Sequence, residues 1–329
     1  MGNAEKLKHF FNLFNGNSRV LVVINADPDA IASAMAVKRL LWRKVNKVAI
    51  AHFNTITRPD NLAMIEYTEP GLVHLDDIKK KEYTDFVVVD SQPDHNKRFA
   101  EFDYNAIIDH HPLTCDQADF ADIREEYGAC ATILAEYLRA NKTKPSQKLA
   151  AALMLGIKTD TADFTRQAHL KDIEAFQYLY KLADKNIVTK VERAILTLDD
   201  LDFLGYAIKN REILHNRIFL HAGTTTKPDE LVMVADFFLT ITRVNWSIIS
   251  GIYDKRLIII IRNDGLRKGA GATAKEAFSM HGSAGGHKTM ARAELDLSSV
   301  KQETGSIAKK AIGEWIISAI TKTAGKKTE

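Results

Sequence analysis

Five short apolar runs in the first third of the chain constrain its fold more than any other feature. They are rich in Val and Ile, are almost free of polar interruptions, and lie at residues 20–24, 48–53, 72–75, 86–89 and 106–108. Such runs are typical of strands buried on both faces of a sheet. Residues 30–42 and 61–67, which lie between them, have helical patterns. Because this alternation is typical of a parallel sheet with helices on both sides, we expect a doubly wound α/β domain with a mainly parallel sheet.

The rest of the chain changes pattern, which predicts a second, smaller domain. Helical patterns at 128–140, 147–157, 170–183 and 188–198 are followed by a possible connecting segment at 201–210. Beyond it we expect strands at 217–222, 245–253, 257–262 and 291–297, with helices at 229–240, 272–280 and 304–323. The length of 329 residues also favours two domains. We therefore predict an α/β domain with a helical connector at 1–210 and a smaller α+β domain at 211–329.

The composition excludes several broad classes of protein. Hydrophobic residues make up 46% of the chain and charged residues 26%, which is typical of a folded globular protein. Lys and Arg total 45 against 42 Asp and Glu, so the chain does not bind nucleic acid through bulk charge. Two cysteines provide no disulfide framework. No apolar run approaches the ~20 residues of a membrane span, and no leader pattern follows the start, so we expect a cytoplasmic protein without a membrane partner.

Acidic and imidazole side chains follow three of the predicted strands. The carboxyl ends of the strands form the ligand crevice of a doubly wound sheet, so these side chains should converge there. Crowded carboxylates repel one another unless cations neutralise them, and a mixed Asp and His set suits Mn²⁺, Zn²⁺ or Mg²⁺. The candidates are Asp27 and Asp29, then Asp90, then Asp109, His110 and His111, together with Asp160 after the helical pattern at 147–157.

Each of these residues also has an ordinary structural interpretation. Asp27 and Asp29 could form a turn and an N-cap before the helix at residue 30. Asp90 and Asp160 could serve as caps or turn residues, and the paired histidines could lie at a strand edge. Their joint occurrence, each at the end of an apolar segment, favours a metal site.

The order of these motifs resembles the DHH phosphoesterase superfamily. The resemblance rests on DPDAIAS at 27–33, Asp90, DHH at 109–111 and GIKTDT at 156–161. This superfamily includes RecJ-like exonucleases, the nanoRNase and pAp-phosphatase branch, cyclic-di-AMP phosphodiesterases and family II inorganic pyrophosphatases. SAGGHK at 283–288 is similar to the Gly-Gly-Gly-His loop of the C-terminal substrate domain in the nuclease-type branches. The resemblance therefore covers nearly the whole chain.

The resemblance implies a site for two cations, expected to be Mn²⁺, with Mg²⁺ or Co²⁺ as alternatives. It implies Asp27 as a ligand of the first metal and Asp90 as a bridge between both. The second metal would also take Asp29, His110 and Asp160. Asp109 and His111 match the motif's orienting acid and its active-site histidine. In this superfamily a metal-bound hydroxide attacks phosphorus, and two cations stabilise the transition state.

One position departs from the superfamily pattern. The pattern begins with a His four residues before the position of Asp27, where this chain has Val23. Valine cannot ligate a metal, so we expect weaker binding at the first site. The leading prediction is hydrolysis of phosphate esters in short oligonucleotides, cyclic dinucleotides or nucleotide bisphosphates. The alternative is a catalytically impaired nucleotide-binding protein, and a homodimer is compatible with both.

The glycine-rich segment 282–289 nearly matches a phosphate-binding P-loop but has the wrong surroundings. A P-loop follows a strand and opens a helix, whereas this segment follows a predicted helix and precedes a predicted strand. The resemblance instead implies a substrate-binding loop that contains Gly285, Gly286, His287 and Lys288. Arg262, at the end of a predicted strand, is implied as a phosphate contact. The ordinary alternatives are that the glycines only form a turn between two elements and that Arg262 is exposed to solvent.

A second glycine motif, GAGATA at 269–274, lies outside any predicted βαβ unit, so we interpret it as a turn into a helix. The resemblance finally implies that catalysis takes place in the cleft between the two domains.

Overall fold

The computed structural model describes residues 2–165, 168–194, 196–225, 227–266 and 268–325. The chain divides into two compact units, Met1–Ile195 and Leu196–Glu329. This division lies before the boundary predicted near residue 210. The reason is that helix α8 (Leu198–Asn210), predicted as a connecting segment, packs within the second unit on helix α9 (Pro228–Leu239) and strand β8 (Arg217–Thr224).

The first unit contains the predicted parallel sheet. Its order is β3-β2-β1-β4-β5-β6, and every neighbouring pair is parallel. After β1 the chain adds β2 and β3 on one side of it and then crosses to add β4, β5 and β6 on the other side. The strand order therefore reverses between β1 and β4. Ligands of such sheets bind at this reversal, beyond the carboxyl ends of the strands. The strands are β1 (Arg19–Ile24), β2 (Lys47–His52), β3 (Leu72–His74), β4 (Asp85–Val89), β5 (Ala106–Asp109) and β6 (Phe120–Ile123).

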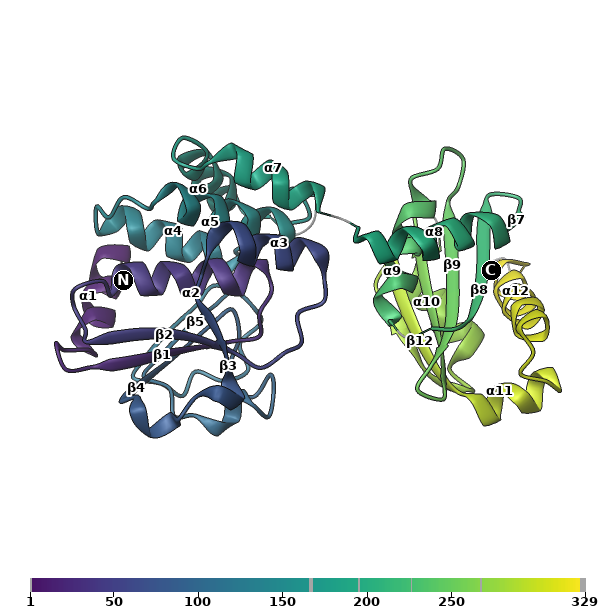
Figure 1. The fold of residues 1–329 in the computed structure, drawn as a ribbon, viewed down its shortest axis with the longest axis horizontal. Helices are drawn as coiled ribbons and strands as arrows, with labels where there is room; N and C mark the ends of the chain where they lie inside the picture. Colours follow the sequence, from purple (N-terminus) through teal and green to yellow (C-terminus); the bar gives the residue numbers. More distant parts are fainter. Residues whose placement is uncertain (1, 166–167, 195, 226, 267, 326–329) are drawn as a thin grey trace. The chain divides into compact units, whose positions relative to one another are not determined.

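The α-helices of this unit gather on one face of the sheet, whereas helices were predicted on both (Figure 1). On β1, Val20 and Val22 pack toward these helices, while Leu21 and Val23 face a second core. Short 3₁₀ helices and loops cover that second face, and the aromatic side chains of Tyr83, Phe99, Phe102 and Tyr104 fill its core. The helices are α1 (Asn3–Asn12), α2 (Pro28–Leu40), α3 (Pro59–Thr68), α4 (Cys130–Ala140), α5 (Gln147–Asp160), α6 (Leu170–Tyr180) and α7 (Lys185–Arg193); the 3₁₀ helices are η1 (Leu75–Asp77), η2 (Lys80–Glu82) and η3 (Phe99–Glu101).

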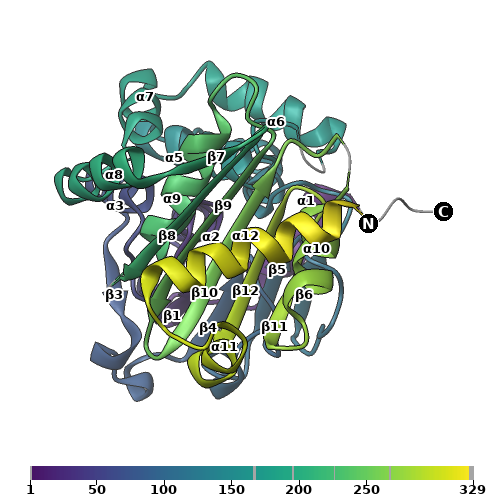
Figure 2. The same cartoon turned by 90° about the vertical axis from the view of Figure 1, so that its right-hand side faces the viewer.

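The second unit is built on a mixed sheet of order β11-β12-β10-β9-β8-β7. Only β8 and β9 run parallel among the pairs described; the others are antiparallel. Helices α8 and α9 contribute to the core on one face, and α10 and α12 contribute to the core on the other, where α12 lies across the sheet (Figure 2). The elements not yet given are β7 (Glu212–Leu214), β9 (Trp246–Tyr253), β10 (Arg256–Asn263), α10 (Ala270–Phe278), β11 (Gly282–Gly286), β12 (Met290–Asp296), α11 (Leu297–Thr304) and α12 (Lys309–Gly325).

Three sequence predictions in the later part of the chain are wrong in detail. The helix expected at 188–198 lies at Lys185–Arg193, because Asp184 caps it by accepting from the Asn186 amide. The glycine-rich loop is mostly strand β11. The final helix, expected from residue 304, begins at Lys309 as α12, and a separate helix, α11, ends just before it at Gly305, whose φ of 69° lies in the left-handed region. Across the described residues, none of the helices has the length and apolar character needed to cross a membrane.

Candidate metal centre

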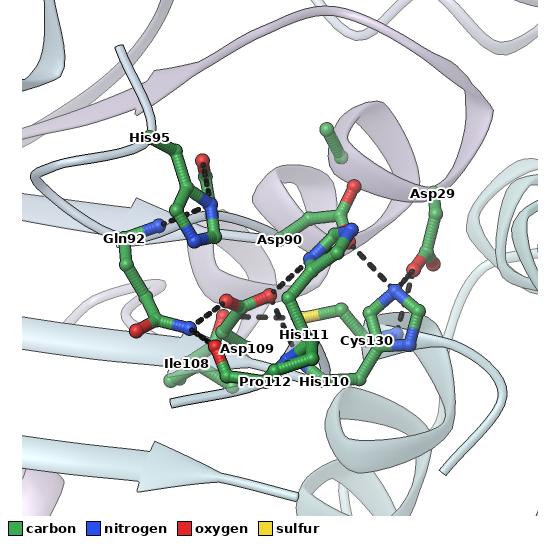
Figure 3. Close-up of polar contacts among 12 residues, drawn as sticks. Asp29, Asp90, Gln92, His95, Ile108, Asp109, His110, His111, Pro112 and Cys130 are labelled. Atoms are coloured by element: carbon green, nitrogen blue, oxygen red, sulfur yellow. Dashed lines mark hydrogen bonds and ion pairs between the residues drawn. The ribbon is translucent and has the colours of Figure 1, made fainter. Parts of the chain in front are cut away.

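The predicted acidic and imidazole residues of the first unit meet at the carboxyl ends of its strands. Asp27 follows β1, Asp90 follows β4, and Asp109 is the last residue of β5. Figure 3 shows side chains from these segments converging, with Asp29 reaching the same place from helix α2. Asp160 is the last residue of α5, three residues beyond the predicted end of that helix.

Four of these residues form a cluster with the spacing of a metal site, which we call the metal cluster: Asp29, Asp90, His110 and Asp160. One ligand atom from each lies within 4.8 Å of the others. The Nε2 atom of His110 lies 3.2 Å from Asp160, 3.3 Å from Asp90 and 4.0 Å from Asp29. The structure therefore brings together the residues that the superfamily resemblance implied for the second metal.

The residues of the metal cluster fit a divalent cation. His110 Nε2 and Asp90 Oδ1 are buried and make no hydrogen bond of normal geometry within the part of the chain that the structure describes. His110 Nδ1 lies 3.2 Å from the Tyr127 carbonyl oxygen, so a proton on Nδ1 leaves the Nε2 lone pair directed at the carboxylates. Three carboxylates and one imidazole form a donor set that suits Mn²⁺ and similar transition metals.

The electrostatics of the cluster also favour a cation. Burial raises the pKa of Asp29 and of Asp90 well above the ordinary value, and the neighbouring carboxylates add to this effect. Burial alone would lower the pKa of His110, but Asp160 and Asp90 outweigh it and raise the pKa to about 12. Without a cation the cluster therefore retains protons, which a metal ion would displace.

Asp29 is held in place by the beginning of α4. Its two carboxylate oxygens accept from the backbone N–H groups of Cys130, at 2.6 Å, and Ala131, at 2.8 Å. Helix α5 packs closely against the same carboxylate at Gly156. A Cβ atom at Gly156 would lie 2.9 Å from Asp29 Oδ1, so only glycine fits without a shift of its neighbours.

Asp90 has an unusual backbone. Its φ is +58°, in the left-handed region that non-glycine residues rarely adopt. Its amide donates to the Ile108 carbonyl oxygen at 2.9 Å, which ties the end of β4 to β5. Such strained residues often lie at functional sites, where the surrounding structure holds them.

Asp109 orients the ring of His111 through a hydrogen bond with Nδ1. Its Oδ1 accepts from His111 Nδ1 and from the His110 amide, both at 2.8 Å. Burial would raise the pKa of Asp109, but hydrogen bonds from His111 and Gln92 outweigh it and lower the pKa, so Asp109 is a carboxylate. The Nε2 atom of His111 is therefore free of this bond, on a side chain that is 44% exposed.

Sequence reasoning did not identify Gln92, although it holds this part of the site together. Gln92 is buried, and its side-chain Nε2 donates to Asp109 Oδ2 at 2.7 Å and to the Pro112 carbonyl oxygen at 3.0 Å. Its carbonyl accepts from the amides of Thr114 and Cys115. The available signal was its position two residues after Asp90, in a polar segment between two buried strands.

Asp27 lies near the metal cluster, and its charge adds to the raised pKa of Asp29 and of Asp90. Its Oδ1 accepts from the Ala30 amide at 2.9 Å, so the predicted N-cap role on α2 is correct. Burial raises its pKa to about 6. Among the described residues, no group of three or more possible ligands within 4.8 Å of one another includes Asp27. Val23 is fully buried in the second core and offers no ligand.

A polar cavity of about 220 Å³ opens beside the metal cluster. Sequence reasoning missed His95. Its Nδ1 accepts from the backbone N–H of Gln92 at 3.2 Å, so the ring proton lies on Nε2, which is a donor. Its ring lies edge-on to His111, with the centroids 5.6 Å apart. The cavity is lined by Asn25, Asp27, Phe53, Asp90, Ser91, His95, Asn96, Phe99 and His111.

In the second unit, Arg262 has a partner of its own. Its Nε donates to Asp236 of α9 at 2.6 Å, and the side chain is 17% exposed. Lys268, close to the end of the strand that contains Arg262, pairs with Glu276.

The two glycine motifs of this unit explain each other. A Cβ atom at Gly271 would lie 2.2 Å from the Gly286 carbonyl oxygen, so β11 and the start of α10 approach closely. The carbonyl groups of His287 and Lys288 accept from the first amides of α10, at Gly271 and Ala270. Both side chains are exposed, and the space beside Gly285 is open. GAGATA is thus the predicted turn into a helix, with Gly269 as its N-cap.

Comparison with known proteins agrees with this architecture. An uncharacterized protein of Methanocaldococcus jannaschii is 33% identical over 312 residues, which are 94% of this chain and 64% of that protein. The chain thus spans somewhat under two thirds of that relative's length. The structure is similar to an exopolyphosphatase-related protein from Bacteroides fragilis, with a TM-score of 0.67, 16% identity and coverage of 96% and 97% of the two chains.

A second solved structure, of exonuclease RecJ bound to manganese, matches with a TM-score of 0.52 and 12% identity over 99% of this chain and 95% of the other. Both structural matches support the same fold. The model of the DHH family, N-terminal domain, matches residues 19–157, which hold Asp27, Asp29, Asp90 and the DHH motif itself. The match confirms the resemblance inferred from the motifs over residues 19–157, where this chain is similar to the DHH family, N-terminal domain.

Proposed function

We propose that this chain is a metal-dependent phosphoesterase. The observation that carries the proposal is the metal cluster, in which His110 Nε2 lies 3.3 Å from Asp90 and neither His110 Nε2 nor Asp90 Oδ1 makes a hydrogen bond of normal geometry among the described residues. Asp29, Asp90, His110 and Asp160 would hold the cation. When bound there, it would supply Lewis-acid stabilisation to the charge on a phosphoryl group. Mn²⁺ suits the imidazole ligand, and Mg²⁺ or Co²⁺ would be alternatives.

His111 acts next to this cluster. Because Asp109 accepts from its Nδ1, the imidazole presents Nε2 to the substrate side, where it binds the phosphoryl group or transfers a proton to the outgoing oxygen. Asp109 fixes the orientation of the ring. His95 adds a second donor on the wall of the adjoining cavity.

The proposed substrates are phosphate esters of the nucleotide type: short oligonucleotides, cyclic dinucleotides or nucleotide bisphosphates. The exonuclease activity named for the RecJ structure supports this class, as do the aromatic side chains of Phe53 and Phe99 in the lining of the cavity. In the second unit, Arg262, Gly285, Gly286, His287 and Lys288 are proposed to bind substrate. Arg262 would exchange Asp236 for a phosphate, whose geometry suits a guanidinium group.

The test is hydrolysis of a dinucleotide, a cyclic dinucleotide and pAp by the purified chain with Mn²⁺, Mg²⁺ or Co²⁺. Asp160→Asn should weaken Mn²⁺ binding by at least ~10-fold and abolish turnover, because it removes one of three carboxylates. Asp163→Asn is the matched control: Asp163 lies three residues away, pairs with Lys158 and has a positive φ that Asn tolerates. Equal effects of both variants would contradict the proposal.

A catalytically impaired nucleotide-binding protein is the second candidate, favoured by Val23, which is buried and cannot serve as a metal ligand. This candidate predicts one tightly bound Mn²⁺ per chain and substrate binding without turnover. Val23→His should then raise the metal stoichiometry or the rate. Tight binding of two Mn²⁺ ions by the wild type, unchanged in the variant, would exclude this candidate.

A further inference from the structure

We propose that Asp172, on α6, is a positioning residue for the metal cluster. The inference rests on the proposed function and extends it to a residue outside the DHH domain match at 19–157. Asp172 is fully buried, and its carboxylate accepts three hydrogen bonds. Oδ2 accepts from the amides of Gly128, at 2.9 Å, and His169, at 2.6 Å, and Oδ1 accepts from Thr132 Oγ1 at 2.5 Å.

Two of these bonds hold the segment that orients the cluster. Between Gly128 and Thr132 lie Cys130 and Ala131, whose amides donate to Asp29. Directly before Gly128 lies Tyr127, whose carbonyl oxygen faces His110 Nδ1. The segment 127–132 therefore sets the position of two of the four metal-cluster residues, and Asp172 fixes it at Gly128 and at Thr132.

The segment 127–132 makes side-chain hydrogen bonds from Tyr127 and Cys130, but its N-cap residue provides no side-chain cap for the first amides of α4. The N-cap of α4 is Ala129, which has no side chain to accept from the first amides of the helix. Asp29 takes two of those amides from one side. Asp172 holds the segment from the other side, so the two buried carboxylates share the beginning of one helix.

Asp172 is also the third residue of a capping box at α6, and a capping role alone must be considered. That role explains the bond from the His169 amide, three residues earlier. It does not explain the bonds from Gly128 and Thr132, which lie 44 and 40 residues away in the sequence. A capping residue that served only α6 would have no effect on the metal affinity of the folded protein.

The test measures Mn²⁺ affinity by titration calorimetry, with thermal unfolding as a check of folding, in the full chain. Asp172→Ala should weaken Mn²⁺ binding by ~10- to 100-fold, the range for groups that orient metal ligands. Asp172→Asn should restore most of the affinity: its Oδ1 can accept from both amides while Nδ2 donates to Thr132 Oγ1. Asp200→Ala is the control, because Asp200 forms an equivalent capping box with Thr197 on α8, in the other unit.

Unchanged Mn²⁺ affinity in a folded Asp172→Ala protein would overturn the inference and leave the proposed function standing. A wild type that binds no Mn²⁺ would overturn both. If Asp172→Ala does not fold, Thr132→Val replaces it, since it removes only the bond to Oδ1. A few-fold loss of affinity is then expected, and no loss would overturn the inference.

Discussion

Hydrogen bonds hold the residues of the metal cluster in place and leave their possible metal-binding atoms close to one another. Both carboxylate oxygens of Asp29 accept hydrogen bonds from backbone amides of α4, and one of them lies 4.0 Å from His110 Nε2. Asp90 is held through its backbone, and its Oδ1 lies 3.3 Å from His110 Nε2. The sequence motifs identified these residues, since each follows a strand or ends a helix. They could not identify Gln92 or Asp172, which act through contacts that only the folded chain creates.

Cation binding at the metal cluster should release protons. Without a cation, the pKa of His110 is raised to about 12 and those of Asp29 and Asp90 are raised well above the ordinary value. The free site therefore holds more protons at pH 7 than the metal-bound site, and Mn²⁺ affinity should rise with pH, with roughly one proton or more released. Calorimetry in buffers of different ionisation enthalpy measures this number, and affinity that is flat between pH 6 and 8 would contradict the expectation.

Gln92→Leu should destabilise the first unit while preserving the size of the side chain. It leaves Asp109 Oδ2 without its donor and the Thr114 and Cys115 amides without their acceptor. A buried polar group left unpaired costs about 1–3 kcal/mol, and the two amides are only partly buried and cost less, so we expect a loss of about 2–4 kcal/mol in the free energy of unfolding. Urea denaturation measures it. Gln147→Leu, at an exposed position on α5, should change stability by under about 0.5 kcal/mol.

At the scale of elements, α2, α4 and α5 meet at Asp29, and Gly156 permits their contact. Gly156→Ala would place its Cβ 2.9 Å from Asp29 Oδ1, 3.0 Å from Asp29 Cα and 3.3 Å from Ala131 Cβ. We expect a loss of about 1–3 kcal/mol by overpacking, together with weaker Mn²⁺ binding, because Asp29 must move. Gly205→Ala, on α8 with open space at the Cβ position, should instead stabilise by about 0.5–1 kcal/mol. Thermal unfolding and Mn²⁺ titration distinguish the two.

The elements that sequence patterns predicted are those with long or uninterrupted apolar signals, such as β1 and α5. Helix α1 and strand β6 were missed because their stability comes from distant partners. Asp122 of β6 pairs with Lys6 of α1 and with Arg124, and Tyr137 of α4 donates to the same carboxylate. Local propensity carries no trace of such buried networks. Strand β11 was missed for a related reason: its glycines have low strand propensity but fit against α10 and β12.

At the scale of the whole molecule, each unit has its own core, and the metal cluster draws all four residues from the first unit. The formal charge of +3 therefore conceals a local excess of buried carboxylates. Two domains and a parallel first sheet could be predicted from length and alternation. The boundary could not, because α8 carries no linker composition and only its packing assigns it to the second unit.

The second unit should lose stability in acid through His221. Burial lowers the pKa of this imidazole to about 4. Its Nδ1 lies 3.0 Å from Ser250 Oγ, whereas Nε2 makes no hydrogen bond with any of the residues that the structure describes. Between pH 6.5 and 4 the unfolded chain takes up a proton that the folded one does not, so stability falls as pH falls through this window, by up to about 3 kcal/mol. Urea unfolding followed by tryptophan fluorescence reports on this unit, because it contains Trp246 and Trp315, two of the three tryptophans.

His221→Leu should flatten this pH dependence. Ser250 keeps its bond to the Leu220 carbonyl oxygen, so the variant leaves no new unpaired group. His215→Asn is the control, since His215 is exposed and has a positive φ that Asn adopts readily, so its loss should leave the slope unchanged. If His221→Leu retained the wild-type slope between pH 6.5 and 4, acid sensitivity would have to originate in other groups, and His221 would be protonated in the folded state.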